Sequence, residues 1–311
     1  MNKPLVSICI PVYNSDVYEV VIINDGGSGC DTKGRDCRKI ARQFSKQVKQ
    51  KVKYLEHLNN TGLVETRREI VQNASGTYIV MADSDDIRPQ NALSSLVNQL
   101  KICEYDIVNG SSQSYKQENG SIIPTDERKQ NVFFGELYGE DIYKKTFVES
   151  KASTFLWAKL IKRELYLEAF NLIPYTTCNY CEDYLIYFFI LRFAKSYKGI
   201  PDLVYHYRID TGISSGNEID LVRWEAYCNP SSSFTIIFAW YQNFKDRGIK
   251  PPISEEDFLA VRNFSYSYME SCVRHLYLTV KPEDRDTARQ MLCEYWGEDF
   301  VISVENQLNF R

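Results

Sequence analysis

The stretch Tyr78-Ile79-Val80-Met81-Ala82-Asp83-Ser84-Asp85-Asp86 is the most informative part of this sequence. Its first five residues are apolar and predict a short buried strand. The acidic residues follow where that strand leaves its sheet, and ligands of open α/β sheets bind just outside the carboxyl ends of strands. Neighbouring carboxylates repel one another unless a cation lies between them. Their hard oxygens suit Mg²⁺ or Mn²⁺, ions that bridge protein carboxylates to a substrate diphosphate.

A helix N-terminus explains the same acidic residues equally well. Ser84, Asp85 or Asp86 could cap a helix that the sequence predicts over residues 89–100. Taken alone, the stretch leaves a metal site and a plain helix cap open.

The composition of the 311 residues is that of a globular protein, with 44% hydrophobic and 25% charged residues. The net charge of −4 implies no general affinity for nucleic acid or for an anionic membrane. No run of about 18 apolar residues predicts a membrane span, and the start of the chain does not resemble a signal peptide. The nine cysteines are an odd number, which is more typical of reduced thiols than of a disulfide framework. We expect a cytoplasmic protein, and peripheral association with the inner face of the membrane stays open.

Two apolar strands are predicted close together near the start, over residues 5–13 and 20–25. A parallel pair needs a crossover of about a dozen residues or more, and only residues 14–19 lie between these two. Either the pair is antiparallel, or residues are missing from the sequence between Asn14 and Val17. We favour missing residues.

Strands and helices alternate along the chain up to about residue 210, which predicts an α/β fold. Helices are expected over residues 37–48, 61–73 and 181–194, and further strands over residues 52–56, 106–109 and 202–208. The remaining residues favour helices, with Ser254 as a cap and Pro282 at a first helical position. We therefore expect a domain over residues 1–216 and a helical region over residues 217–311.

Several motifs in order resemble the family 2 glycosyltransferases of the GT-A fold. They are the segments 7–14, 21–26, 60–67 and 83–86, together with 157–165, 180–185 and 205–214. The resemblance covers about residues 4–216. It implies a GT-A nucleotide-sugar-binding fold, with a mostly parallel central sheet flanked by helices, and a C-terminal helical appendage. The family also has a helix between its first two strands, which this chain lacks.

The resemblance implies roles for individual residues. It makes Asp85 the ligand of Mn²⁺ or Mg²⁺, with Asp83 contributing to the metal and contacting the nucleoside. Asp25 would accept a hydrogen bond from a uracil-like N–H. The further residues of the nucleotide site would be Pro11, Tyr13, Asn14, Asn60, Gly62, Arg67 and Ser84. Read singly, Pro11 could equally end a strand, Tyr13 could be core and Asp25 could be a turn residue.

Two further groups complete the expected site. The acceptor hydroxyl needs a base, and the resemblance assigns this role to Asp183, with Glu182 as the second candidate. An acidic helix start, favoured by the helix dipole, is the plain alternative. Arg208, His206 and Ser214 are candidates to hold the diphosphate when a late loop closes.

The resemblance implies a metal-dependent, inverting glycosyltransferase. Its donor would be a nucleotide sugar, expected to be UDP-linked, and its acceptor a glycan or lipid-linked saccharide in the synthesis of capsule, O-antigen or exopolysaccharide. A sugar nucleotidyltransferase is one alternative, although residues 12–15 show no Gly-rich loop with Arg and Lys. The other is a non-catalytic module that binds a nucleotide sugar or acts as a scaffold, which the retention of Asp83, Asp85 and Asp183 argues against.

Overall fold

The structure is a computed structural model that describes residues 6–13, 17–49, 51–118, 121–127, 130–211 and 219–310, with side chains from residue 19 onward. The chain divides into two compact units. The first comprises residues 1–177 and 186–210, and the second residues 178–185 and 211–311. The boundary predicted after residue 216 falls in the segment 212–218, outside the described residues.

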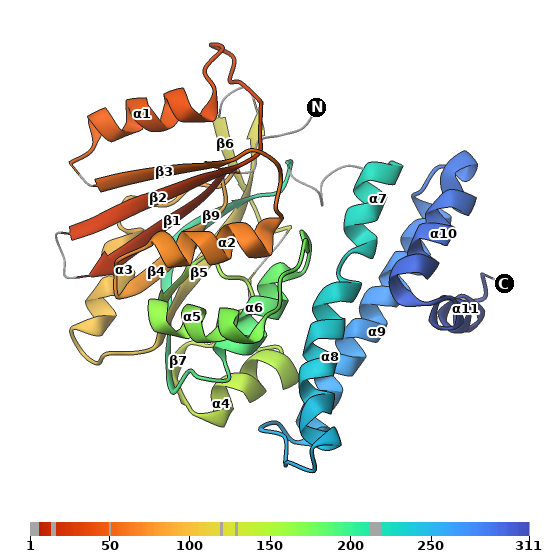
Figure 1. The fold of residues 1–311 in the computed structure, drawn as a ribbon. Coiled ribbons are helices and arrows are strands. Elements are labelled where there is room, and N and C mark those ends of the chain that lie inside the picture. The colour runs from red at the N-terminus through yellow and green to blue at the C-terminus, as the bar shows by residue number, and fades with distance from the viewer. Residues whose placement is uncertain are drawn as a thin grey trace. The chain divides into compact units, whose positions relative to one another are not determined.

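The first unit holds all the strands that the structure describes (Figure 1). They are β1 (Val6–Tyr13), β2 (Val17–Asp25), β3 (Lys51–His57), β4 (Tyr78–Ala82), β5 (Ile107–Glu118), β6 (Ser121–Thr125), β7 (Gly135–Tyr138), β8 (Lys159–Lys162) and β9 (Ser196–Arg208). Its helices are α1 (Cys37–Gln47), α2 (Leu63–Asn73), α3 (Ala92–Leu100), α4 (Glu140–Tyr143), a π-helical turn (Lys144–Val148), α5 (Arg163–Leu172) and the last part of α6 (Glu182–Ile190).

These strands form one nine-stranded sheet in the order β3-β2-β1-β4-β8-β5-β9-β7, with β6 paired to β5. Among the described pairs, β2–β3 and β5–β9 are parallel and the others are antiparallel. The sheet is therefore mixed, although β2, β3, β4, β5 and β9 all run in one direction. The α/β fold with a helix-flanked sheet is confirmed, whereas the expected mostly parallel pairing is not observed.

The first strand runs against both of its neighbours. Tyr13 lies opposite Val17 of β2, and Val12 lies opposite Tyr78 of β4, so β1 ends where those two strands begin. The expectation of a parallel first pair was wrong, because the short connection from β1 to β2 cannot make the crossover that parallel strands need. The connection itself, where we expected missing residues, lies outside the described residues.

Helices cover both faces of the sheet, with α2 and α5 in front in Figure 1. Side chains of β2 and β4 alternate between the two faces. Ile22 and Ala82 both lie opposite Ile8, so they share a face, on which Ile22 packs with α1 and Ala82 with α3. The apolar strand β4 and residues 19–25 of β2 are buried because both faces of the sheet are covered there.

The second unit is helical, as the composition predicted. Its elements are the start of α6, then α7 (Leu221–Cys228), α8 (Ser231–Asp246), α9 (Glu255–Leu278), a 3₁₀ turn (Pro282–Asp284), α10 (Arg285–Trp296) and α11 (Glu298–Gln307). Ser254 accepts a hydrogen bond from the Asp257 N–H and caps α9, and Pro282 occupies the first position of the 3₁₀ turn. None of the described helices is both long and apolar enough to cross a bilayer.

The amphipathic stretch of residues 159–169 divides between a strand and a helix. Residues 159–162 form the buried strand β8, which pairs with β4 and β5, and α5 begins directly after it. Four residues are too few to show a period, so the strand could not be separated from the helix in the sequence.

Candidate active site

One edge of the sheet gathers polar side chains from several strands. Because β2, β3, β4 and β9 share a direction, their carboxyl ends lie at the same edge. Asp25, His57 and Arg208 stand at three of these ends, and Asp83 directly follows the fourth. Pro11 and Tyr13 belong to β1 and approach the opposite edge, so the structure does not bring them to this site.

The acidic residues 83–86, which we call the acidic loop, connect β4 to α3 without capping the helix. The helix α3 begins at Ala92, and its N-cap residue is Asn91. Ser84, Asp85 and Asp86 lie too far before that start to bond the first N–H groups of the helix. The helix-cap alternative is therefore excluded.

Asp86 is held by the neighbouring strand β9. One of its carboxyl oxygens accepts a hydrogen bond from the Tyr205 hydroxyl at 2.7 Å, and the other accepts one from the Arg208 backbone N–H at 2.7 Å. Burial raises the pKa of Asp86 to about 7, and the charges of Asp83 and Asp85 add to the rise. Asp86 therefore ties the acidic loop to β9 and is poorly suited to hold a metal.

The other two carboxylates of the acidic loop are more accessible. Asp83 is half-buried and lies 3.3 Å from the buried guanidinium of Arg67 on α2, and its backbone N–H donates to Tyr205. Asp85 is exposed, and its backbone carbonyl accepts a hydrogen bond from Tyr115 of β5 at 3.0 Å. The backbone of the acidic loop is thus fixed from β5 and β9, while the Asp85 side chain faces solvent.

Asp25, at the end of β2, has a different environment. Its side chain is 0% exposed. One carboxylate oxygen lies 2.7 Å from Nδ1 of His57 and accepts hydrogen bonds from the N–H and hydroxyl of Thr61, while the other accepts from the Gly62 N–H at 3.1 Å. The carboxylate therefore presents no surface to a base, and the expected uracil contact does not fit this placement.

His57 lies between two carboxylates. Its Nδ1 contacts Asp25, and its Nε2 lies 2.6 Å from Glu69 on α2. Burial acts to lower the pKa of His57, but the hydrogen bonds and charges of Asp25 and Glu69 outweigh it and raise that pKa. Burial likewise acts to raise the pKa of Asp25, but the hydrogen bonds from His57 and Thr61 bring it below its usual value. The network joins β2, β3 and α2.

Two glycines let the neighbouring loops approach each other. Gly26 has φ +74°, and a Cβ there would lie 2.6 Å from the backbone of Asn59. Gly62 has φ +95°, and a Cβ there would lie 3.1 Å from the backbone of Thr177. Exposed Asn60 lies between these contacts, and its side chain donates to the Asp25 carbonyl at 3.4 Å. Asn60 and Gly62 thus stand on the same edge as the acidic loop.

The predicted diphosphate residues lie at the end of β9. The Arg208 side chain pairs with Asp210 at 2.7 Å, while its backbone holds Asp86. His206 forms a backbone bridge with Ile87, directly after the acidic loop, and burial lowers its pKa. Asn14 and Ser214 lie outside the described residues.

Glu182 and Asp183 begin α6 and belong to the second unit. Glu182 is buried and Asp183 is half-buried. The residue before them, Cys181, has φ +59°, which is unusual for a side chain other than glycine. Its carbonyl accepts the first backbone hydrogen bond of the helix, from Leu185 at 3.2 Å. The two acids thus stand at a helix start whose backbone geometry is strained.

Residues 12–165 match the model of glycosyl transferase family 2. The chain carries a family 2 glycosyltransferase domain. Three curated relatives bear this out, although each is distant and matched only in part.

Glycosyltransferase GlyA of Streptococcus pneumoniae is 27% identical over 180 residues, which are 52% of this chain and 25% of GlyA. Glycosyltransferase GlyG of the same organism is 25% identical over 70% of this chain and 75% of GlyG. The protein EpsH of Bacillus subtilis is 27% identical over 67% of this chain and 62% of EpsH. The match thus spans only a quarter of GlyA and less than two thirds of EpsH. The family match and these relatives agree that the chain carries a glycosyltransferase domain.

A solved structure of S. aureus TarS residues 1–349, in complex with UDP-GlcNAc, aligns over 94% of this chain and 82% of that chain. The TM-score is 0.48 at 16% identity.

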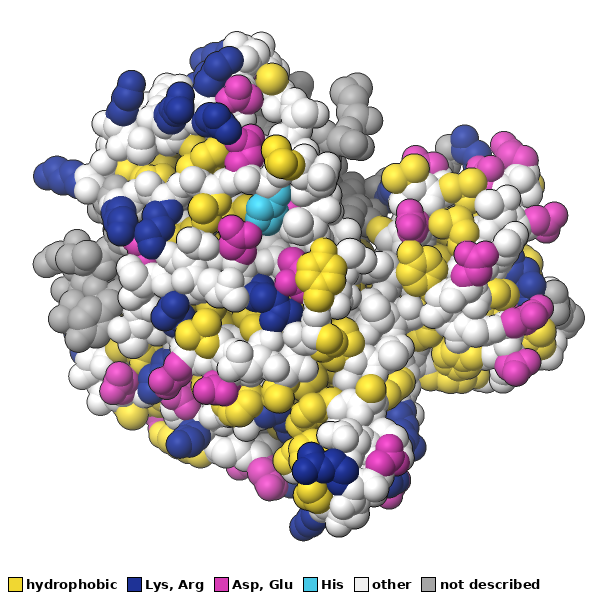
Figure 2. Space-filling model, viewed as in Figure 1, with side chains coloured by type: hydrophobic (Ala, Val, Ile, Leu, Met, Phe, Trp, Pro, Cys, Tyr) yellow, Lys and Arg dark blue, Asp and Glu magenta, His cyan; other side chains and the backbone are white. Residues whose placement is uncertain are grey.

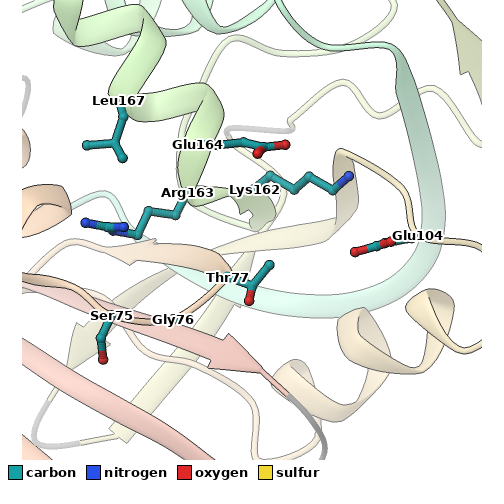
Figure 3. Close-up of a pocket in the computed structure, with 8 residues that line it drawn as sticks. All are labelled: Ser75, Gly76, Thr77, Glu104, Lys162, Arg163, Glu164 and Leu167. Carbon is teal, nitrogen blue, oxygen red and sulfur yellow. The ribbon is translucent and has the colours of Figure 1, made fainter.

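The glycosyltransferase domain also has a pocket at the opposite edge of its sheet (Figure 3). Its volume is about 320 Å³, and its lining includes Thr77, directly before β4, and Lys162, at the end of β8. Lys162 pairs with Asp106 at 2.9 Å, and Arg163, which points away from Lys162 in Figure 3, donates to the Val71 carbonyl. Since both cations are engaged by the protein, this pocket is a poor site for a diphosphate.

Residues that hold the acidic loop were missed by the sequence interpretation. Tyr205 and Tyr115 position its backbone, and His57 fixes the loop that follows β3. Tyr205 lies in the segment 205–214 that carried part of the family resemblance, which was a usable signal. Nothing in the sequence marks Tyr115, because its partner is a backbone carbonyl 30 residues away.

Proposed function

We propose that this glycosyltransferase is metal-dependent and inverting, and that it transfers a sugar from a nucleotide sugar to a hydroxyl acceptor. The observation that supports the proposal is that the three carboxylates of the acidic loop have different environments. Asp86 is tied to β9, Asp83 is half-buried beside Arg67, and Asp85 faces solvent at the end of a central strand. A fixed backbone that presents an exposed carboxylate is what a metal–diphosphate complex requires.

Asp85 and Asp83 fit the metal in this proposal. The described residues contain no group of three or more His, Cys, Asp or Glu side chains placed to hold an ion. Mg²⁺ commonly binds through one or two carboxylates and completes its shell with substrate phosphates and water. Two accessible carboxylates therefore suffice, and Mn²⁺ or Mg²⁺ bound there would offset the charge of the leaving diphosphate.

The nucleotide would lie beside the acidic loop, against Asn60, Gly62 and Ser84. Arg67 would act through Asp83, since its guanidinium is buried and contacts that carboxylate. Asp25 supports the same edge by holding the backbone of Thr61 and Gly62. Roles for Pro11, Tyr13 and Asn14 remain predictions from the family resemblance, as do diphosphate contacts of Arg208, His206 and Ser214.

Asp183 is the proposed base. The acceptor oxygen must attack from behind the anomeric carbon while a positioned group takes its proton. Asp183 is more accessible than its neighbour Glu182, and both follow the strained backbone of Cys181. We keep Asp183 as the base and Glu182 as the second candidate.

The donor in this proposal is a UDP-sugar, and the acceptor is a glycan or lipid-linked saccharide in surface glycan synthesis at the cytoplasmic face of the membrane. Membership of family 2 favours this reaction over sugar nucleotide synthesis and over a non-catalytic module. The test is a donor screen in which nucleotide sugars, Mn²⁺ and candidate acceptors are incubated with the protein, and release of nucleoside diphosphate is measured. Absence of turnover with every donor would contradict the proposal.

The base is tested by comparing Asp183→Asn with Glu182→Gln. General-base assistance is worth about 10²–10⁴-fold in rate, so Asp183→Asn should lower turnover by about that range and leave nucleotide affinity nearly unchanged. Asn is tolerated at a helix start, so the variant should fold. Near wild-type turnover in Asp183→Asn and a large loss in Glu182→Gln would show that the two roles are exchanged.

A further inference from the structure

The surface around α1 concentrates positive charge in an otherwise acidic chain. Residues 31–56 contain nine Lys and Arg and three Asp and Glu, whereas the whole chain has a formal net charge of −4. Figure 2 shows Lys and Arg side chains gathered over the part of the first unit where α1 lies in Figure 1. The catalytic proposal uses none of these side chains.

Some of these cations are neutralised by neighbours. Arg35 pairs with Asp31 at 2.6 Å, Arg38 pairs with Glu56, and Lys39 lies 3.7 Å from Asp36. Lys53 is partly engaged by Glu19 and by the Asn73 carbonyl. The remaining five cations are exposed and make no ion pair within the described chain: Lys33, Arg42, Lys46, Lys49 and Lys51. We call these five residues the α1 basic surface.

The helix α1 carries two cations of this surface, and its exposed apolar side chains lie elsewhere on the helix. Of its eleven residues only Ala41 is buried, and it packs with Val20 and Ile22 of β2. Ile40 and Phe44, one turn apart, are 41% and 37% exposed. Arg42 and Lys46 are also one turn apart, and at about 100° per residue they lie on nearly the opposite side of the helix from that apolar pair. The unpaired cations and the exposed apolar side chains thus lie on different sides of the helix.

We propose that the α1 basic surface docks this protein on a membrane that contains anionic lipids. Clusters of four to eight Lys or Arg on an amphipathic helix bind anionic lipids, with each cation near the surface worth about 1 kcal/mol. The low net charge of the chain does not prevent this, because a surface charge acts within a Debye length of about 8 Å.

Protection of the edge strand β3 against pairing with other chains explains only part of the positive charge. β3 is an edge strand, and lysines on such strands discourage pairing with other chains. This explanation covers Lys51, which begins β3, but not Arg42, Lys46 or Lys49, which lie on α1 and just after it. Membrane docking accounts for all three of these cations. It would also hold the domain close to the lipid-linked acceptor of the proposed function.

The test is co-sedimentation of the full chain with vesicles of phosphatidylcholine alone and of phosphatidylcholine mixed with phosphatidylglycerol. We expect binding to the anionic vesicles only, and release when salt is raised from about 0.15 M to about 1 M. The variant Arg42→Gln, Lys46→Gln, Lys49→Gln should bind at least about 100-fold more weakly. The matched control neutralises the exposed Lys101, Lys151 and Lys250, and it should bind as the wild type does.

Lipid binding is measured without a donor or acceptor, so its result is independent of the proposed transfer reaction. The docking proposal can fail while the transfer reaction is confirmed, and the transfer reaction can fail while docking is confirmed. The α1 variant should also retain transfer to a water-soluble acceptor, since its substitutions lie outside the catalytic machinery. No binding of the wild type to anionic vesicles at about 0.15 M salt would overturn the docking proposal. Equal weakening in the α1 and control variants would also overturn it, because net charge alone would then explain the binding.

Discussion

Asp25 and Asp85 stand at the ends of strands that run in the same direction, yet the protein uses them differently. The Asp25 side chain is 0% exposed and bonds to His57, Thr61 and Gly62. Asp85 is exposed, and the backbone of its loop is fixed from β5 and β9. One carboxylate is therefore buried in the framework at this edge of the sheet, while the other is exposed there.

The difference between Asp25 and Asp85 shows that a position at a strand end does not by itself make a carboxylate accessible. The direction of the strand brings a carboxylate to the ligand-binding edge. Whether it remains accessible depends on side chains that arrive from elsewhere in the chain. Asp25 meets the loop after β3, whereas in the acidic loop the Tyr205 hydroxyl and the Arg208 backbone N–H bond to the Asp86 carboxyl group.

The largest expected effect is on Asp85. Asp85→Asn should lower turnover by at least about 1,000-fold, because the proposed metal ligand and its charge would be lost opposite the diphosphate. Since the side chain is exposed, the free energy of unfolding should change by less than about 0.5 kcal/mol. Steady-state kinetics and urea unfolding measure the two quantities. If Asp85→Asn lost stability and kept its turnover, Asp85 would have the structural role that we assign to Asp25.

Asp25→Asn should show the opposite pattern. The amide would place an N–H group against a donor such as the Gly62 N–H and leave His57 with only one of its two charged partners, at a cost of about 3–5 kcal/mol in unfolding free energy. Urea unfolding measures this cost. Turnover per folded molecule should fall far less than in Asp85→Asn. A stable but inactive variant would show that Asp25 contacts the substrate after all.

The hydroxyl of Tyr205 should matter both to stability and to the metal. Tyr205→Phe removes the donor to Asp86 and the acceptor of the Asp83 N–H, which should cost about 1–3 kcal/mol. It should also raise the Mn²⁺ concentration for half-maximal turnover by about 10-fold or more.

Tyr197→Phe is the matched control for Tyr205→Phe. Tyr197 is a buried tyrosine near the other end of β9, and its hydroxyl bonds to Asn109 and to the Phe133 carbonyl. It should lose stability and keep the wild-type metal requirement. If both variants needed the same Mn²⁺ concentration for half-maximal turnover, Tyr205 would have no role in positioning the metal ligands.

The smallest expected effect is the pH dependence of the His57 network. The pKa of His57 is raised in the folded state, so its stabilisation is fully present below about pH 6.5 and is lost as the pH rises through the folded pKa. The difference in Tm between wild type and His57→Gln should therefore shrink above about pH 6.5. The contrast is His275, whose pKa burial lowers, so its contribution should shrink as the pH falls below about 6.5. Thermal melts over a pH series distinguish the two, and a pH-independent difference for His57 would contradict its assignment.

Much of the fold could be predicted because its signals are local. The apolar strand β4, the helices α1 and α2, and the Ser254 cap each follow from a few neighbouring residues. The reversal of β1 could not be predicted with the same ease, because the family resemblance favoured a parallel strand and only the short connection opposed it.

The site divides in the same way. Asp83, Asp85 and Arg67 were predicted, and the structure places all three at one edge of the sheet. The burial of Asp25 and the capture of Asp86 could not be predicted, because their partners lie 32 to 122 residues away. Hydrogen bonds over such separations leave no periodic signal in a single sequence.

The most direct test is a titration of Mn²⁺ against the wild type, Asp85→Asn and Asp25→Asn in the presence of UDP, with bound ion and rate of sugar transfer both recorded. We predict that wild type and folded Asp25→Asn bind one ion and need it for transfer, while Asp85→Asn has lost both. Full transfer by the wild type in excess chelator, or unchanged ion binding in Asp85→Asn, would contradict the assignment of the metal site to the acidic loop.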